Sequence, residues 1–176
     1  MHNVRVNQIQ AAAERARSDP EAARMDIRLR GAWRVETEKP QFGAAVTFPA
    51  GELTLESDFP PFLGGEGRAP TPLAYCFYGA MSCYGATFAI QAAMLGVELR
   101  SLRIDLSLEV DFSTALGLDA LPPLSEFRFD VEVETDSDDV TVQRIKQLAD
   151  DRCPAIWAMS HAVPYSTTAR RASAPL

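Results

Sequence analysis

Three cysteines, Cys76, Cys83 and Cys153, are the residues of this 176-residue chain best suited to nucleophilic or redox chemistry. A thiolate is a strong nucleophile, and two thiols that meet can close a disulfide. Cys76 and Cys83 are seven residues apart, so they would lie two turns apart on roughly one helical face. Cys153 precedes a proline and begins a short helical turn, where unpaired N–H groups stabilise a thiolate. Seventy residues separate Cys83 from Cys153, so only the fold can bring their sulfurs together.

The same cysteines could instead be structural, because an unpaired cysteine often packs as a small buried hydrophobic side chain. A metal site has little support, since His2 and His161 lie near opposite ends and no Cys-x-x-Cys or His-x-x-x-His pair occurs. His161 follows Cys153 by eight residues and could serve as a base, orient its thiol or simply occupy a helix end. We expect neither a metal nor a cofactor.

The composition narrows the classes of partner. Hydrophobic residues make up 47% and charged residues 23%, which is typical of a globular domain with its own core. The net charge of −7 disfavours binding to nucleic acid. No uninterrupted apolar run reaches the length of a membrane span, and residues 1–20 show no export signal, so we expect no membrane partner. Three thiols without such a signal favour a reducing, cytoplasmic location.

The chain divides at about residue 24. Residues 1–24 are predicted to form an N-terminal helical arm, broken at Asp19-Pro20, and residues 25–176 form the main domain. Alternating apolar residues from Met25 to Val35, over 42–48 and from Leu53 predict a three-stranded β-meander.

A central helix is predicted from Thr71-Pro72 to about Leu95, with Gly96 as its C-cap. It contains no charged residue, so we expect it to be buried on all sides. Strands over 99–112 and about 127–133, a helix over 140–152, a short helical turn after Cys153 and a last strand over 163–169 complete an α+β pattern.

The order of these motifs resembles the OsmC/Ohr family. A glycine-rich loop, Gly64-Gly65-Glu66-Gly67, precedes a Thr-Pro helix start, and Cys83 follows Pro72 by eleven residues. Cys153-Pro154 and Val163-Pro164 match the family's second cysteine and its final strand. The resemblance covers about residues 25–170. A phosphate-binding reading of the glycine loop is weaker, because the Gly-Lys-Ser/Thr ending of a P-loop is absent.

The resemblance implies an intertwined homodimer, with antiparallel sheets around long buried central helices. It also implies a thiol peroxidase: Cys83 attacks an organic hydroperoxide and becomes a sulfenic acid, Cys153 resolves it as a disulfide, and an external dithiol reduces the enzyme. Family members use an arginine to stabilise the thiolate, for which Arg34 aligns best and Arg30 is the alternative. We expect an apolar substrate pocket lined by aromatic residues, namely Phe77, Tyr84, Phe88 and Trp157.

One position departs from the family. The glutamate that holds the arginine is replaced by Leu73, directly after the helix-start proline, and Glu66 is a candidate substitute. The departure motivates an alternative function: a non-catalytic dimer that binds a hydrophobic small molecule. A third reading is an interaction protein whose arm, residues 1–24, contacts a partner. The sequence assigns no role to Cys76.

Overall fold

A computed structural model describes residues 1–118 and 122–171 of the chain. Its first sheet is the predicted meander: β1 (Arg30–Trp33), β2 (Phe42–Phe48) and β3 (Gly51–Ser57) pair antiparallel in that order. The prediction for β2 is confirmed residue for residue. β1 begins later than expected, because the segment before Arg30 has no paired neighbour and its apolar side chains Ile27 and Leu29 are exposed.

The long central helix is α2, Pro72–Met94. Its start follows from the sequence: the Thr71 hydroxyl accepts a hydrogen bond from the Ala74 N–H at 3.2 Å, and Pro72 occupies the first turn. Its end follows as well, since Gly96 takes a left-handed conformation with φ +73° that L side chains rarely adopt. Both predicted helix boundaries are therefore confirmed.

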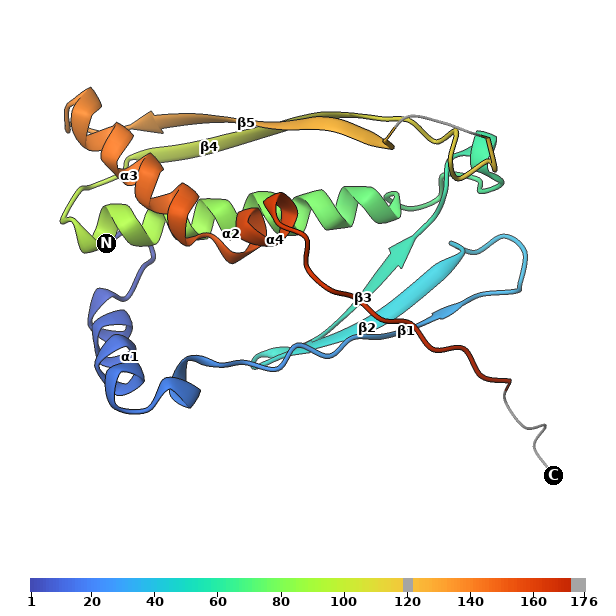
Figure 1. Cartoon of the computed structure of the whole chain (residues 1–176), viewed down its shortest axis with the longest axis horizontal. Coiled ribbons are helices and arrows are strands. Elements are labelled where there is room, and N and C mark those ends of the chain that lie inside the picture. The colour runs from blue at the N-terminus through green and yellow to red at the C-terminus, as the bar shows by residue number, and fades with distance from the viewer. Residues whose placement is uncertain (119–121, 172–176) are drawn as a thin grey trace.

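A two-stranded antiparallel sheet covers one side of α2 (Figure 1). It consists of β4 (Ser101–Val110) and β5 (Leu124–Glu134), in which Ile104 lies opposite Val131 and Leu106 opposite Phe129. Charged residues alternate with these apolar ones and are exposed. The sheet therefore turns one apolar face to α2 and one polar face to water, as the alternation predicts.

Two further helices cross α2 (Figure 1): α3 (Asp139–Arg152) and α4 (Pro154–Ser160). Asp138 caps α3, its carboxylate accepting from the Thr141 N–H at 2.8 Å. Apolar residues spaced by one helical turn pack α3 against α2. They form the buried core with Val97: Tyr84, Phe88 and Ala92 from α2, and Ile145, Ala149 and Cys153 from α3 and its end.

The predicted last strand is wrong. Residues 161–171 form no strand, and they are exposed. A strand needs a neighbouring edge to complete its backbone hydrogen bonds, and this segment pairs with neither sheet within the described chain. The sequence of the segment alone does not supply that edge.

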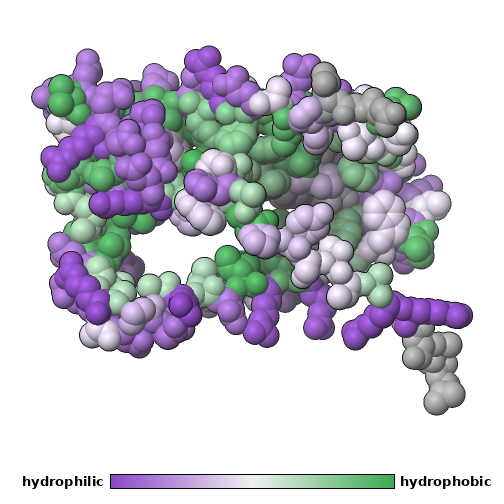
Figure 2. Space-filling model, in the orientation of Figure 1, coloured by the Kyte–Doolittle hydropathy of each residue, from purple (hydrophilic) through white to green (hydrophobic). Residues whose placement is uncertain are grey.

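The N-terminal arm is helical, as predicted. It consists of α1 (Val6–Ser18) and a short 3₁₀ helix over Pro20–Ala23, which Asp19 caps. The start of the arm is tied to the connection between α2 and β4, because His2 Nδ1 accepts a hydrogen bond from the Leu99 N–H at 3.1 Å. The chain then runs from the arm to the first sheet. Figure 2 shows an open gap between the arm with this connecting segment and the rest of the molecule.

One face of α2 differs from the sequence expectation of a helix buried all round. β4, α3 and α4 cover one side, whereas Gly79, Ser82 and Ala86 on the other side are exposed, with nothing within 4 Å of a side chain built on Gly79. By length and apolar composition alone α2 could also cross a membrane. A core helix has the same composition, and the covered side of α2 packs as one, with Phe88 and Ala92 fully buried.

The glycine-rich loop is held by one buried carboxylate, that of Asp58, which directly follows β3. Its Oδ2 accepts from the backbone N–H groups of Arg68 at 2.9 Å and Glu66 at 3.2 Å. Gln41 adds a second tie by donating to the Gly64 carbonyl at 3.0 Å. Gly65 lies so close to the Phe59 carbonyl that any side chain there would collide with it. These contacts fix the path from the first sheet to α2.

Asp58 should make stability depend on acidic pH. The N–H of Arg68, followed by that of Glu66, lowers the pKa of Asp58 below its ordinary value of 3.8, so its carboxylate stabilises the fold above that pH. We expect Asp58→Asn to lower the free energy of unfolding at pH 7, and the difference from the wild type to shrink below pH 3.8. Urea unfolding at several pH values measures this. Asp26→Asn, at an exposed ion pair, is the control and should show little change.

Candidate functional site

The fold brings Cys83 and Cys153 together. Their sulfurs are 3.8 Å apart although 70 residues separate them in the chain. Cys83 lies in the middle of α2, and Cys153 lies where α3 ends and α4 begins, so the packing of α3 on α2 creates the pair. A disulfide needs a sulfur–sulfur distance of about 2.05 Å, so closure requires an approach of about 1.8 Å.

The three cysteines differ in accessibility. Cys153 is only 1% exposed and belongs to the core, Cys83 is partly buried, and Cys76 is exposed. Cys76 lies about 10 Å from Cys83 along the helix axis, as two turns of α2 require. The structure therefore pairs Cys83 with Cys153 and leaves Cys76 outside the pair.

The environment of Cys83 acts on its acidity in two directions. Burial raises the pKa of the Cys83 thiol, and so does the neighbouring Cys153, whereas a hydrogen bond from the Ala155 backbone N–H lowers it. That N–H belongs to the first turn of α4, so the helix start donates directly to the sulfur. The net direction is a raised pKa, so these groups together disfavour the thiolate of Cys83.

Arg34 lies elsewhere in the chain, directly after β1 of the first sheet. Its guanidinium pairs with Glu56 on β3 at 2.6 Å and donates to the Pro40 carbonyl at 3.4 Å. Gly43 on β2 lies directly beneath it, and a side chain there would meet the guanidinium at 2.7 Å. Arg30, the alternative, begins β1 and is exposed. Neither arginine is among the groups that shift the pKa of Cys83.

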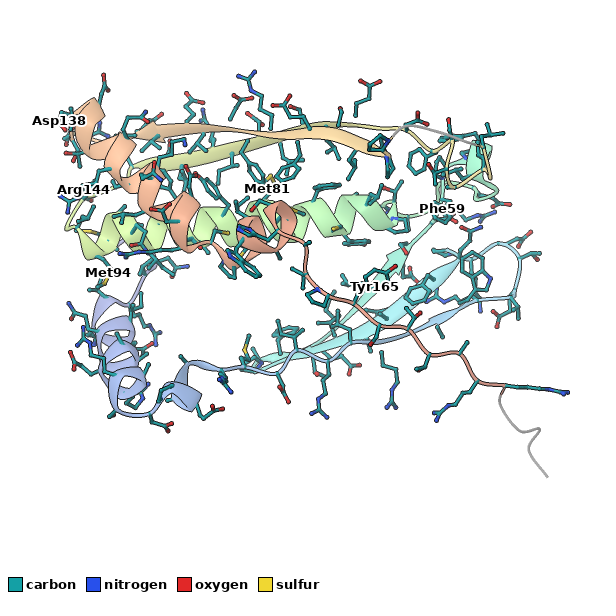
Figure 3. The ribbon with its side chains drawn as sticks, in the orientation of Figure 1. Phe59, Met81, Met94, Asp138, Arg144 and Tyr165 are labelled. Atoms are coloured by element: carbon teal, nitrogen blue, oxygen red, sulfur yellow. The ribbon has the colours of Figure 1, made fainter. Side chains whose placement is uncertain are left out.

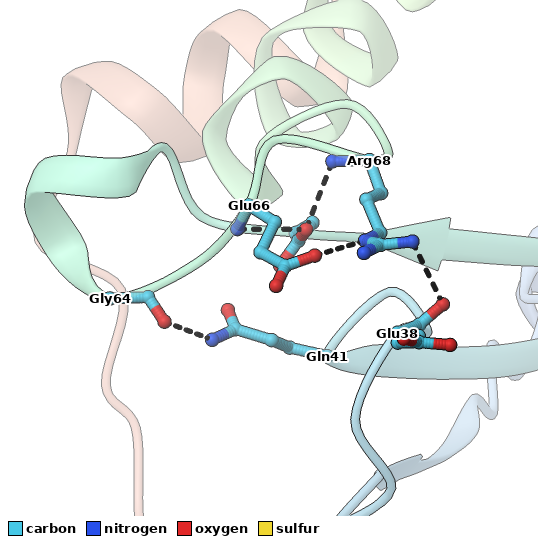
Figure 4. A network of polar contacts seen from close by, with 6 residues as sticks. Glu38, Gln41, Gly64, Glu66 and Arg68 are labelled. Atoms are coloured by element: carbon cyan, nitrogen blue, oxygen red, sulfur yellow. Dashed lines mark hydrogen bonds and ion pairs between the residues drawn. The ribbon is translucent and has the colours of Figure 1, made fainter.

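The predicted substitute carboxylate, Glu66, forms an ion pair with Arg68 and not with Arg34 (Figure 4). The carboxylate that holds Arg34 is Glu56, which no sequence motif marks. Glu56 could have been found only from the register of the meander, because it lies opposite Gly43, beside the position of the guanidinium.

An apolar groove of about 450 Å³ lies between the first half of α2 and β4. Met81 projects from α2 on this side (Figure 3). Phe62 and Phe112 meet edge to face at 5.6 Å, and Phe112 lines the groove. The groove is lined by Pro60, Thr71, Leu73, Ala74, Phe77, Tyr78, Met81, Leu106, Leu108, Val110 and Phe112. Leu73 therefore contributes to an apolar surface.

The four aromatic residues predicted for a substrate pocket lie in different places. Phe77 lines the groove. Tyr84 and Phe88 lie in the core, where the Tyr84 ring packs against Phe129 with centroids 5.4 Å apart. Trp157 on α4 is 54% exposed and stacks on His161 at 4.8 Å between centroids.

Two polar contacts beside the sulfur pair were not found from the sequence. The Tyr84 hydroxyl donates to Asp150 Oδ1 at 2.8 Å, and Arg152 donates to Gln91 Oε1 at 2.7 Å. Asp150 is one of several acidic residues along α3, and no sequence signal distinguishes it. Gln91 was conspicuous as the single amide of an uncharged helix, but its partner lies 61 residues away.

Comparison with known proteins gives one family. The model of the family described as OsmC-like protein matches residues 65–168. No curated protein sequence matches the chain. Solved structures with the same fold include an OsmC-like protein from Mycoplasma pneumoniae, with a TM-score of 0.56 and 15% identity over 77% of this chain and 89% of that one.

Two proteins from Vibrio cholerae are also similar in fold. One is an OsmC-like protein of unknown function, with a TM-score of 0.55 and 12% identity over 77% of this chain and 94% of that one. The other is provisionally named an organic hydroperoxide resistance protein and holds captopril in one active site. It has a TM-score of 0.50 and 15% identity over 78% of this chain and 87% of that one. The expected α+β fold is thereby confirmed.

The sulfur pair predicts a specific cross-link. Mild oxidation of the reduced protein should join Cys83 to Cys153, and the closed loop should raise the free energy of unfolding by up to about 4 kcal/mol. Peptide mass mapping and urea unfolding of the reduced and oxidised forms measure both effects. Cys76→Ser should leave the link unchanged, and a link through Cys76 in the wild type would contradict the assignment.

Proposed function

Because the chain belongs to the OsmC-like protein family, we propose that it is a thiol peroxidase that reduces organic hydroperoxides through Cys83 and Cys153. The observation that carries the proposal is the 3.8 Å contact between two sulfurs from distant parts of the chain. The provisional name of the Vibrio cholerae protein with the same fold supports the substrate class.

The proposed reaction has three balanced steps. The Cys83 thiolate attacks the terminal peroxide oxygen, which gives Cys83 sulfenic acid and releases an alkoxide that takes up a proton as the alcohol. The Cys153 thiol then attacks the sulfenic sulfur, forms the Cys83–Cys153 disulfide and expels the oxygen as water. An external dithiol reduces this disulfide by two exchange steps and leaves as its own disulfide.

Activation of Cys83 needs a cation or hydrogen-bond donors, because its own burial raises the pKa. Ala155 supplies one N–H donor. We assign the positive charge to Arg34, with Glu56 taking the role of the glutamate that Leu73 replaces. Glu56, which holds Arg34, lies beside Pro72 at the start of α2, and Cys83 lies about 16 Å further along the helix axis. The charge of Arg34 must therefore reach Cys83 through a rearrangement or from a second copy of the chain.

A homodimer would supply that second copy. The uncovered face of α2 carries the small residues Gly79, Ser82 and Ala86, which allow close packing of another helix. We propose that residues 25–176 form the dimerising domain and that the arm, residues 1–24, is an addition to it.

Mass in solution tests the dimer. The wild type should have twice the chain mass of 19.3 kDa. Ala86→Arg should yield monomers, because a long charged side chain would be forced into the helix contact, whereas Gln143→Arg on the exposed side of α3 should leave the dimer intact. Light scattering after gel filtration measures all three proteins, and a monomeric wild type would contradict the proposal.

We propose that the groove between α2 and β4 receives the apolar part of the substrate. The peroxide end must extend beyond the groove to reach Cys83, because neither Cys83 nor Cys153 lines it. Phe77 and Leu73 line it, so it favours alkyl or aryl hydroperoxides over hydrogen peroxide, which buries no apolar surface. Because the chemistry consumes thiols and needs an external dithiol, we propose a cytoplasmic location.

Turnover assays on cysteine variants test the chemistry. Cys83→Ser should abolish reduction of an aryl hydroperoxide, since the attacking sulfur is gone. Cys153→Ser should consume about one equivalent and stop, because the sulfenic acid has no resolving thiol. Peroxide loss and the mass of the Cys83 peptide are measured, and Cys76→Ser is the control. Multiple turnover by Cys83→Ser would refute the proposal.

Binding of a hydrophobic molecule without catalysis is the second candidate, favoured by the apolar side chain of Leu73 in the groove. Both functions use the groove, so Leu73→Glu should weaken binding of an apolar ligand or raise KM for an aryl hydroperoxide by about tenfold, since it buries a charge. Leu53→Glu, on the exposed part of β3, is the control. Ligand binding together with an absence of wild-type peroxide turnover would favour the second function.

A further inference from the structure

Tyr84, which is buried, and Asp150, which is half-buried, form a contact next to the sulfur pair that the proposed chemistry does not use. Tyr84 directly follows Cys83 on α2, and Asp150 lies three residues before Cys153 in the last turn of α3. The hydrogen bond between them, at 2.8 Å, therefore joins the two chain segments that carry the thiols.

The protonation of Tyr84 and the two hydrogen bonds to Asp150 hold this contact in place. Burial, and then the Asp150 carboxylate, raise the pKa of Tyr84 well above its ordinary value, so the phenol stays protonated and donates a hydrogen bond. The second oxygen of Asp150 accepts from Lys146 Nζ at 2.6 Å, one turn earlier on α3. The carboxylate is thus held on one side by its own helix and on the other side by α2.

A second tie acts on the same turn. Arg152, the residue before Cys153, donates to Gln91 Oε1 at 2.7 Å, and Gln91 is buried on α2. The last turn of α3 is therefore fastened to α2 by two hydrogen bonds with a charged partner, which are stronger than neutral ones. Cys153 follows this turn without an intervening residue.

We propose that Tyr84 and Asp150 are positioning residues that hold Cys153 against Cys83 and so set the equilibrium and rate of disulfide closure. The role in turnover rests on the proposed function. The closure itself does not, because a thiol oxidant such as glutathione disulfide converts the protein dithiol to the disulfide and leaves as two molecules of glutathione.

The physical basis is the effective concentration of one thiol at the other. The sulfurs start at 3.8 Å and must approach by about 1.8 Å, so small displacements of the α3 end decide how often they meet. Loss of a hydrogen bond to a charged group loosens that end. We expect the equilibrium constant for closure to fall about tenfold.

The test measures this equilibrium in mixtures of reduced and oxidised glutathione, with acid quenching and mass analysis of the Cys83 and Cys153 peptides. Tyr84→Phe removes the hydroxyl and keeps the ring that packs on Phe129. Tyr165→Phe, at a 90% exposed tyrosine, is the matched control. Asp150→Asn is paired with Asp151→Asn, whose carboxylate accepts only from Gln147 among the described residues.

The positioning role predicts a lower equilibrium constant in Tyr84→Phe and Asp150→Asn, wild-type values in both controls, and a double variant no worse than the more affected single one. A residue that merely stabilises the fold would lower the unfolding midpoint of the reduced and oxidised forms alike and leave this constant unchanged, which would overturn the inference.

The outcomes for the two proposals can be separated. If the wild type consumes no peroxide but Tyr84→Phe shifts the glutathione equilibrium, the proposed function fails and the positioning role stands. If the wild type turns over peroxide and Tyr84→Phe has an unchanged equilibrium constant, the function stands and the positioning role is wrong. If both hold, Tyr84→Phe should also keep its first rapid equivalent of peroxide consumption and slow the subsequent disulfide closure.

Discussion

The packing of α3 against α2 is the contact on which the candidate site depends. Phe88 and Ile145 are fully buried in it, and Cys153 extends the same apolar row to the end of α3. Cys83 lies at the margin of this contact. Because the row fixes where α3 ends, it also fixes the sulfur of Cys153 opposite that of Cys83.

The polar groups near the α2–α3 contact have a different role. Buried apolar surface stabilises the packing without specifying direction, whereas hydrogen bonds fix a distance and an angle. Tyr84 and Gln91 are the polar residues that α2 buries in this region, and each has a partner in the last turn of α3. The helix is thus uncharged along its length and still oriented at the point where the thiols meet.

The elements before and after α2 contact this helix to different extents. β4, α3 and α4 cover one side, while the first sheet is fastened to the start of α2 through Asp58 and the glycine-rich loop. Small side chains remain on the uncovered face, and Arg34 remains on the first sheet with Glu56. The small residues on the uncovered face of α2 leave room for close approach of a second copy, which is the premise of our proposal for activation of Cys83.

Local physics determined most of the elements from the sequence alone: the Thr71-Pro72 start and Gly96 end of α2, the residues of β2, and the alternation of β4. These depend on neighbours within a few residues, as caps and strand periodicity do. Only the tertiary structure decided that Glu56 holds Arg34, that Asp150 meets Tyr84, and that residues 163–169 form no strand, because each needs a partner from a distant segment. The pairing of Cys83 with Cys153 belongs partly to each: the family resemblance implies it, but the packing of α3 on α2 creates it.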